Sequence, residues 1–152
     1  MSESSASLSQ PLYGASLPQA VARFFRKYAT FCGRASRSEY WWVWLAQFLV
    51  GLVTATLIAA GGGYDFQYLT SGGVAPTSPL ITIGYVLSTL ISLATLVPWL
   101  AVIWRRLHDA NLAGPMFFLT FIPIVGGIIL IVLLTLPSKP EGARFDVRPT
   151  AA

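Results

Sequence analysis

The polar chemistry of this sequence is concentrated in two short blocks, residues 33–41 and residues 105–111, which lie on either side of long apolar stretches. The blocks supply guanidinium, carboxylate and imidazole groups, and these side chains form what we call the polar cluster. Its members are Arg34, Arg37, Glu39, Arg105, Arg106, His108 and Asp109.

If the two blocks meet, we expect forked arginine–carboxylate pairs that hold their segments in a fixed register. Glu39 would pair with one of the two adjacent arginines of the second block. Asp109 would pair with Arg34 or Arg37. We interpret the polar cluster as a set of structural or binding residues.

An enzyme acting on a phosphorylated or lipid substrate is a weaker hypothesis. His108 would be its general base, oriented by Asp109, and the arginines would hold a phosphate. Adjacent helix residues do not face each other, so Asp109 is badly placed to orient His108. The sequence has no second histidine, metal-ligand spacing, glycine-rich phosphate loop or nucleophile elbow. We therefore predict no catalytic residue, no metal site and no cofactor.

Composition indicates the solvent in which these residues act. The chain has 152 residues, of which 55% are hydrophobic and 11% are charged, whereas soluble domains carry about 25% charged residues. This excludes a soluble enzyme and a disordered regulator, and the single Cys32 excludes a disulfide scaffold. The net charge is +4, and the basic residues flank apolar runs. This position favours anionic membrane lipids over nucleic acid as partners.

Three runs without ionisable side chains predict transmembrane helices over residues 41–60, 80–104 and 115–136. At about 1.5 Å per residue each reaches about 30 Å or more, which is the thickness of a bilayer core. The predicted fold class is an all-α membrane protein, with three transmembrane helices preceded by an amphipathic interfacial helix.

The interfacial helix is predicted over residues 17–32, where aromatic and aliphatic residues recur at helical spacing. Ser16 and Gln19 form a capping-box pattern, and Gly33 is a fitting stop. Arg23, Arg26 and Lys27 point away from the apolar face. Such a helix lies in the plane of an anionic surface, with packing against a partner protein as the alternative.

The membrane domain thus covers residues 16–136. We predict a disordered tail over residues 1–15 and a flexible tail over residues 137–152. If the chain has three full spans, seven Lys and Arg residues lie on the same side of the membrane as the N-terminus and three lie on the opposite side. This difference predicts a cytoplasmic N-terminus. Pro123 and the pair Gly126-Gly127 leave open a re-entrant hairpin, which would return the C-terminus to the cytoplasm.

Two further patterns concern the helices themselves. Aromatic side chains at one predicted boundary would act as interfacial anchors: Tyr40, Trp41, Trp42 and Trp104. Small residues at four-residue spacing would let helices pack closely: Gly51, Ala55, Ala59, Gly84, Ser88 and Ser92.

Three blocks of the sequence resemble the signature of a bacterial inner-membrane family known as domain of unknown function 805. They are Phe25-x-Lys27-Tyr28-x-x-Phe31-x-Gly33-Arg34-x-x-Arg37-x-Glu39-Tyr40-Trp41, Arg105-Arg106-Leu107-His108-Asp109 and Ile122-Pro123-x-x-Gly126. The resemblance covers roughly residues 24–145. It implies an inner-membrane location and supplies no reaction. The chain departs from the family pattern at residues 113–116 and at residues 142–146.

We therefore predict a small multi-pass bacterial inner-membrane protein without enzymatic activity. Its basic cytoplasmic face would bind anionic lipid headgroups or a membrane protein partner, which includes a second copy of the chain. The alternative is a subunit of an oligomeric transporter or channel, for which Gln47, Thr54 and Thr95 are candidate lining residues. The spans contain no ionisable residue of the kind that usually marks a transport path.

Overall fold

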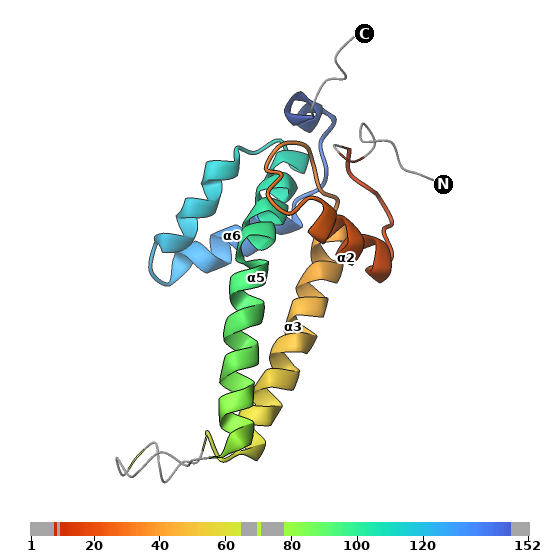
Figure 1. Cartoon of the computed structure of the whole chain (residues 1–152). Helices are drawn as coiled ribbons and strands as arrows, with labels where there is room; N and C mark the ends of the chain where they lie inside the picture. The colour runs from red at the N-terminus through yellow and green to blue at the C-terminus, as the bar shows by residue number, and fades with distance from the viewer. Residues whose placement is uncertain (1–7, 9, 65–69, 71–77, 147–152) are drawn as a thin grey trace. The chain divides into compact units, whose positions relative to one another are not determined.

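The computed structural model describes residue 8, residues 10–64, residue 70 and residues 78–146 (Figure 1). These residues form helices and contain no strand, so the all-α prediction is confirmed. The helices are α2 (Leu17–Arg26), α3 (Arg37–Ala60), α5 (Pro79–Asp109), η1 (Gly114–Phe121), α6 (Val125–Thr135) and η2 (Pro140–Phe145).

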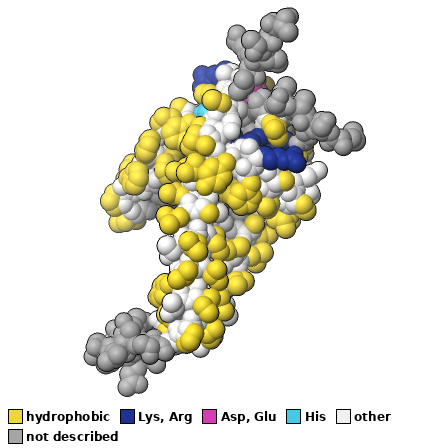
Figure 2. All heavy atoms as spheres, viewed as in Figure 1, with side chains coloured by type: hydrophobic (Ala, Val, Ile, Leu, Met, Phe, Trp, Pro, Cys, Tyr) yellow, Lys and Arg dark blue, Asp and Glu magenta, His cyan; other side chains and the backbone are white. Residues whose placement is uncertain are grey.

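The chain divides into two compact units. The terminal unit consists of Met1–Trp44 and Val97–Ala152, and the central unit is Leu45–Leu96. Helices α3 and α5 contribute one end to each unit. Every Lys and Arg of the sequence falls within the range of the terminal unit, and on the face drawn in Figure 2 the visible Lys and Arg side chains lie in the upper part of the view.

Helices α3 and α5 are the two described helices long and apolar enough to cross a membrane. Their 24 and 31 residues correspond to about 36 Å and 46 Å. Their most apolar windows are 17% and 28% buried, and Val53, Leu90 and Leu93 each expose more than half of their surface. Apolar helices this exposed are typical of lipid-facing spans rather than of a soluble core.

In the central unit the two helices meet at Gly84. A Cβ on Gly84 would lie 2.6 Å from Ile58 Cγ1 and 3.2 Å from the carbonyl oxygen of Thr54, so only glycine allows this approach. Gly84 on α5 therefore packs as the small-residue pattern predicts. A Cβ on Gly51 of α3 would have no neighbour within 4 Å, and the α3 residues buried in the central unit are Thr54 and Ile58. Packing of Gly51 against a second copy of the chain stays a prediction.

The other small residues are more open. Ala59 is exposed and Ala55 half-buried on α3, while Ser88 is half-buried and Ser92 exposed on α5. Gln47 donates a hydrogen bond to Thr95 Oγ1 over 2.7 Å. This amide–hydroxyl bond satisfies two polar groups within an otherwise apolar helix pair.

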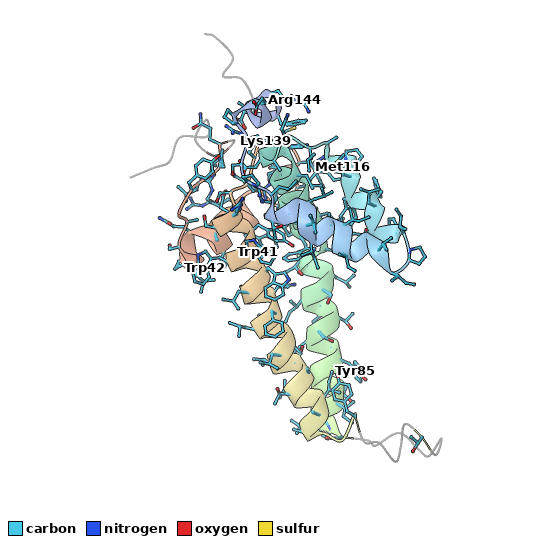
Figure 3. All side chains as sticks on the ribbon, turned by 180° about the vertical axis from the view of Figure 1, so that it is seen from behind. Trp41, Trp42, Tyr85, Met116, Lys139 and Arg144 are labelled. Carbon is cyan, nitrogen blue, oxygen red and sulfur yellow. The ribbon has the colours of Figure 1, made fainter. Side chains whose placement is uncertain are left out.

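The core of the terminal unit joins four helices. Phe24 from α2 and Val43 from α3 pack with Val102 and Leu107 of α5, and Leu134 of α6 joins the same cluster. Figures 1 and 3 show α6 lying across the carboxyl-terminal part of α5. This packing fixes the segments that carry the polar cluster.

The single continuous helix expected over residues 115–136 is not found. The region forms η1 and α6, separated by Ile122–Ile124. Pro123 cannot donate an intrahelical hydrogen bond. Ile124 has a φ of 69° and a ψ of −53°, the backbone of a γ-turn, which the Val125 N–H closes on the Pro123 carbonyl over 2.8 Å. The structure does not confirm a third transmembrane helix.

Helix α2 is also shorter than predicted, since it ends at Arg26 rather than near residue 32. Its start after Ser16 agrees with the capping pattern, because the Ser16 N–H donates to Gln19 Oε1 over 2.9 Å. The following residues leave the helix to pair with other segments: the Gly33 N–H donates to the Phe145 carbonyl over 2.8 Å, and the Ala35 N–H donates to the Arg105 carbonyl over 3.0 Å.

Both predicted tails contain residues that pack on the terminal unit. Residues 10–15 run past the start of α3, where the Leu12 N–H donates to Glu39 over 3.1 Å and the Ala15 N–H to Ser38 over 2.9 Å. Residues 137–146 return to the end of α5 and form η2. The tail predictions for residues 1–7, 9 and 147–152 lie outside the described residues.

Candidate functional site: a polar network and pocket

The start of α3 is held by a capping box that the sequence analysis missed. The Ser36 N–H donates to Glu39 Oε2 over 2.9 Å, and the Glu39 N–H donates to Ser36 Oγ over 3.2 Å. The Ser-x-x-Glu pattern of residues 36–39 is the signal that would have found it. Glu39 is thereby fixed at the first turn of α3, where the helix dipole favours a carboxylate.

Glu39 pairs with Arg23 of α2, not with either arginine of the second block. Arg23 Nε donates to Glu39 Oε1 over 2.5 Å, and both side chains are 4% exposed. Arg23 Nη2 also donates to the Gln10 carbonyl over 2.6 Å. The predictions that Glu39 meets Arg105 or Arg106 and that Arg23 points outward are therefore wrong, because α2 packs with its Ala20–Phe24 side against the core.

Asp109 is the meeting point of three segments. Arg106 Nη1 donates to Asp109 Oδ2 over 2.7 Å, and both side chains are fully buried. Tyr13 donates to Oδ1 over 3.2 Å, and Ser138 donates to Oδ2. Burial, together with the charge of Asp109, raises the pKa of Tyr13, so its phenol remains a donor at neutral pH. The predicted pairing of Asp109 with Arg34 or Arg37 is wrong, because Arg106 lies one turn away on the same helix.

Two arginines hold the carboxyl end of α6. Arg106 Nε donates to the Leu134 carbonyl over 3.0 Å and Arg106 Nη2 donates to the Leu136 carbonyl. Arg37 Nε donates to the same Leu136 carbonyl over 3.0 Å. The last carbonyls of a helix lack intrahelical partners and carry partial negative charge, so these guanidinium groups cap α6.

Arg34 and His108 hold η2. Arg34 forms a two-pronged ion pair with Asp146, with nitrogen–oxygen distances of 2.7 to 3.1 Å, and these hydrogen bonds raise the pKa of Arg34. The His108 ring stacks on Phe145 with 3.9 Å between ring centroids and 4° between planes. His108 Nδ1 lies 3.1 Å from the Gly33 carbonyl oxygen, and because a carbonyl only accepts, this nitrogen carries the proton.

Arg105 is buried beside the Arg23–Glu39 pair. Its Nε donates to the Ala101 carbonyl over 3.1 Å. Arg105, Arg23 and Glu39 are among the residues that line a void of about 10 Å³, which is room for one water molecule at most. The seven predicted residues are thus brought together in the terminal unit, as expected, but with different partners.

The aromatic residues divide into packing and exposed groups. Tyr40 is buried and contacts Trp41 and Trp99, and Trp104 packs edge-on against Phe31. A Cβ on Gly114 would fall within the Trp104 ring. Among the four predicted anchors, Trp42 on α3 is the most exposed, at 38%. Figure 3 labels Trp41 and Trp42 on this helix.

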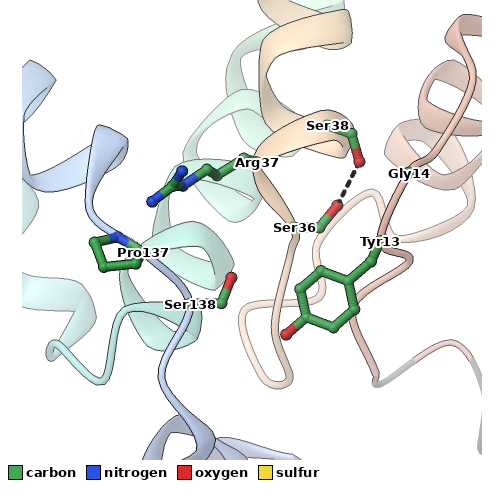
Figure 4. Close-up of a pocket in the computed structure, with 7 residues that line it drawn as sticks. All are labelled: Tyr13, Gly14, Ser36, Arg37, Ser38, Pro137 and Ser138. Carbon is green, nitrogen blue, oxygen red and sulfur yellow. Dashed lines mark hydrogen bonds between the residues drawn. The ribbon is translucent and has the colours of Figure 1, made fainter.

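A pocket of about 390 Å³ opens beside this network (Figure 4). Its described lining consists of Tyr13, Gly14, Ser36, Arg37, Ser38, Pro137 and Ser138. Ser36 Oγ and Ser38 Oγ are 2.9 Å apart. The lining offers hydroxyl groups and one guanidinium group, and no described lining residue is a carboxylate. Sequence reasoning identified Arg37 but missed the four hydroxyl residues.

The hydroxyl groups of Tyr13 and Ser138 already donate to Asp109, and Ser36 Oγ donates to the Leu12 carbonyl over 2.6 Å. The lining group suited to an anion is therefore the Arg37 guanidinium group, which carries a positive charge. Arg37 is exposed, whereas the other cluster members are buried or partly buried by their partners. Among the residues that the structure describes, no three His, Cys, Asp or Glu side chains are grouped so that they could hold a metal ion.

The model of the family described as "Protein of unknown function (DUF805)" matches residues 28–147. The chain belongs to this family. Inner membrane protein YhaI of Escherichia coli strain K12 is 34% identical over 124 residues, which are 82% of this chain and 89% of YhaI. Inner membrane protein YhaH of the same strain is 29% identical over 127 residues, which are 84% of this chain and 93% of YhaH. No solved structure matches the chain.

The DUF805 match contains all seven residues of the polar cluster, as the sequence resemblance implied. It also contains Asp146, which pairs with Arg34, at a place where the sequence departs from the family pattern. Arg23 and Tyr13 lie outside the matched range. The names of the relatives agree with the two long apolar helices: this DUF805 chain is a membrane protein.

Proposed function

We propose that this chain is a non-enzymatic protein of the bacterial inner membrane that binds the phosphate of an anionic phospholipid headgroup in the pocket beside Arg37. The single observation that carries this proposal is a pocket that holds the Arg37 guanidinium group at the start of a membrane-spanning helix. Arg37 Nε donates to the Leu136 carbonyl, and a phosphodiester oxygen can accept hydrogen bonds from the Nη groups of the same side chain.

The depth of the pocket supports a lipid rather than a soluble anion. Arg37 precedes the exposed Trp42 by five residues of α3, which is about 7.5 Å along the helix axis. Tryptophan rings favour the boundary between headgroups and acyl chains, and the headgroup layer is about 5–7 Å thick on each side. Arg37 therefore lies at headgroup height when Trp42 lies at that boundary.

The electrostatics of the pocket favour an anion. The start of α3 carries the positive end of a helix dipole, and Arg37 adds a full positive charge. The carboxylates nearby already have partners, since Glu39 pairs with Arg23 and Asp109 with Arg106. A phosphate would therefore meet the Arg37 guanidinium group without a competing free carboxylate among the described lining residues.

The distribution of charge supports a cytoplasmic N-terminus. All ten Lys and Arg residues fall in the ranges of the terminal unit and none in residues 45–96. Such asymmetry orients a membrane protein with its basic end in the cytoplasm. Anionic lipids of that leaflet would then face the pocket.

The environment of His108 supports a non-enzymatic role. Its ring is stacked on Phe145, and its Nδ1 is engaged with the Gly33 carbonyl. A general base must reach the proton that it removes, and His108 instead holds η2 in place.

The test is native mass spectrometry of the protein released from mixed micelles that contain equal amounts of phosphatidylglycerol and phosphatidylcholine. We expect wild-type protein to retain one phosphatidylglycerol in preference to phosphatidylcholine. Arg37→Gln removes a charge-assisted hydrogen bond, worth about 1.5–3 kcal/mol, so retention of phosphatidylglycerol should fall about tenfold or more.

Arg144→Gln is the matched control, because it removes the same charge from an exposed residue away from the pocket lining. It should retain phosphatidylglycerol like the wild type. Equal losses for the two variants would mean diffuse charge attraction, and equal retention of both lipids by wild type would contradict the proposal. Glycerol 3-phosphate added in excess distinguishes a headgroup site from a site for soluble phosphate. It would displace phosphatidylglycerol from a site for soluble phosphate and leave phosphatidylglycerol bound at a headgroup site.

A second candidate, a subunit of an oligomeric transporter or channel, is favoured by one observation in the central unit. A pocket of about 200 Å³ there is lined by Gln47, Gly51, Thr54, Ser88 and Ser92, together with Val50 and Ile91. Two helices cannot enclose a path by themselves, so this function needs several copies. The same native mass spectra report the number of chains, and a monomer would exclude it.

A further inference from the structure

We infer that residues 114–136 form a re-entrant hairpin that enters and leaves one leaflet of the membrane from the same side, with its apolar surface against the acyl chains of that leaflet. This inference does not rest on the proposed lipid-headgroup pocket. It concerns a different surface, formed by η1, α6 and the turn between them.

The two ends of the apolar run lie next to each other. Arg106, near the end of α5, donates to the Leu134 carbonyl over 3.0 Å. The Lys139 N–H donates to the Asp109 carbonyl over 2.8 Å. A helix crossing the bilayer over residues 115–136 would carry its far end about 33 Å from its start. These contacts within the terminal unit are incompatible with such a crossing.

The lengths of the two helices fit half a bilayer. The eight residues of η1 and the 11 residues of α6 each extend about 16 Å, against about 30 Å for the whole hydrocarbon core. The turn between them carries Ile124, which is 93% exposed. The hairpin can therefore reach the middle of the bilayer at most.

The surface of the hairpin fits acyl chains rather than water. Residues 110–138 contain no Asp, Glu, Lys, Arg or His. Its large exposed side chains are apolar on both helices and at the turn: Met116, Phe118, Phe121, Ile122, Ile124, Val125, Ile128, Ile131 and Val132.

The backbone of the turn is also suited to hydrocarbon, where an unpaired N–H is costly. The Ile122 N–H donates to Leu119 over 3.0 Å, the Val125 N–H to Pro123 over 2.8 Å and the Gly126 N–H to Ile122 over 2.9 Å. Residues 121–125 are exposed, so the backbone of the turn is satisfied by these hydrogen bonds within the hairpin rather than by other segments. Leu130 and Leu134 pack the second helix of the hairpin onto the core that includes Val102 and Leu107.

The same contacts place both described chain ends on one side of the membrane. The start of α3 and the end of α5 are joined by the hydrogen bond from Ala35 to the Arg105 carbonyl, and residues 139–146 are bonded to the same region through Asp109 and Arg34. The described part of the chain therefore crosses the membrane twice.

Cysteine labelling in bacterial cells tests this topology. The natural Cys32 is exposed and reports the amino-terminal side in the wild type. In a Cys32→Ser background, Ala143→Cys reports the carboxyl-terminal side, Tyr64→Cys the loop between α3 and α5, and Ile124→Cys the turn of the hairpin. Each variant is treated with a membrane-impermeant maleimide, once in intact spheroplasts and once in inverted membrane vesicles.

We expect the cysteines at 32 and 143 to react in the same preparation and the cysteine at 64 to react in the other. The cysteine at 124 should react in neither until detergent is added. Reaction of 143 together with 64 would show a third crossing and overturn the inference. Reaction of 124 in intact membranes, from either side, would overturn insertion into the acyl-chain region. Inversion of all sites together would leave the hairpin supported and contradict only the proposed orientation.

Discussion

The adjacent glycines at the start of α6 have opposite surroundings. A Cβ on Gly126 would lie 2.2 Å from the Leu119 carbonyl oxygen, whereas a Cβ on Gly127 would have no neighbour within 4 Å. The backbone of η1 passes against Gly126, so the hairpin can close only if this residue lacks a side chain. Gly127 has no such role.

We therefore expect Gly126→Ala to destabilise the fold by about 1–3 kcal/mol, because a rigid backbone atom must move. Gly127→Ala should be neutral or stabilise by about 0.5–1 kcal/mol, since alanine favours a helix interior over glycine. Thermal unfolding in detergent micelles, followed by tryptophan fluorescence, measures both. Equal effects would mean that η1 and α6 do not pack as described.

At this scale the sequence predicted which polar residues gather but not how they pair. Charge type and spacing placed Arg106 and Asp109 near the same end of the membrane helices. The partner of Glu39 could not be predicted, because Arg23 lies on the polar face of an amphipathic pattern, which predicts an exposed side chain. The burial of Arg23 depends on how α2 packs against the other helices, and this packing cannot be inferred from hydrophobic periodicity.

Between elements, the Arg23–Glu39 pair joins α2 to α3. Glu39→Gln keeps the capping acceptor but leaves Arg23 buried without its counter-charge, so we expect a loss of about 3–5 kcal/mol. The double variant Arg23→Met with Glu39→Gln removes the charge of Arg23 as well, leaving Arg105 as the neighbouring buried charge, and should be more stable than Glu39→Gln alone. Chemical denaturation in micelles gives the free energies of unfolding.

Arg26→Met serves as the control, because Arg26 follows on the same helix but is exposed, and its replacement should change stability by less than about 0.5 kcal/mol. Additive losses in the double variant would contradict a direct interaction between Arg23 and Glu39.

The two long helices were predicted well because each is an uninterrupted apolar run without charge. The third run has a similar apolar composition, so composition alone predicts a third transmembrane helix there. What divides it is local backbone chemistry at Pro123 and Ile124. The return of the chain depends on Arg106 and Arg37 capping the last carbonyls of α6, which a linear pattern does not reveal.

For the whole molecule, the segregation of positive charge predicts a fixed orientation. Tyr64→Lys with Thr70→Lys adds two positive charges to the segment between α3 and α5, which otherwise has none. This weakens the charge asymmetry, so a minor fraction of chains should insert in reverse. Labelling of Cys32 by an impermeant maleimide in intact spheroplasts should rise above its wild-type level.

Tyr64→Gln with Thr70→Gln controls for the loss of the native side chains and should leave labelling at the wild-type level. If the two double variants behave alike, positive charge does not set the orientation. Composition predicted the membrane environment of the whole chain, because 11% charged residues cannot cover a water-soluble surface. It could not predict the side of the C-terminus, which depends on contacts between distant residues.

The contacts that close the polar network span long stretches of sequence: Arg34 and Asp146 are 112 positions apart, and Tyr13 and Asp109 are 96 apart. Contacts of such separation form slowly, because closing a long loop costs entropy before any bond is gained. The helices can thus insert before the chain ends dock. In that interval Asp109 lacks its bond from Tyr13, and Arg34 lacks its partner Asp146, whereas Arg106 can already bond Asp109 and the Leu134 carbonyl. A chain stalled at this stage would carry an incompletely satisfied charged site at the membrane surface, a mark by which proteases could distinguish it from a finished molecule.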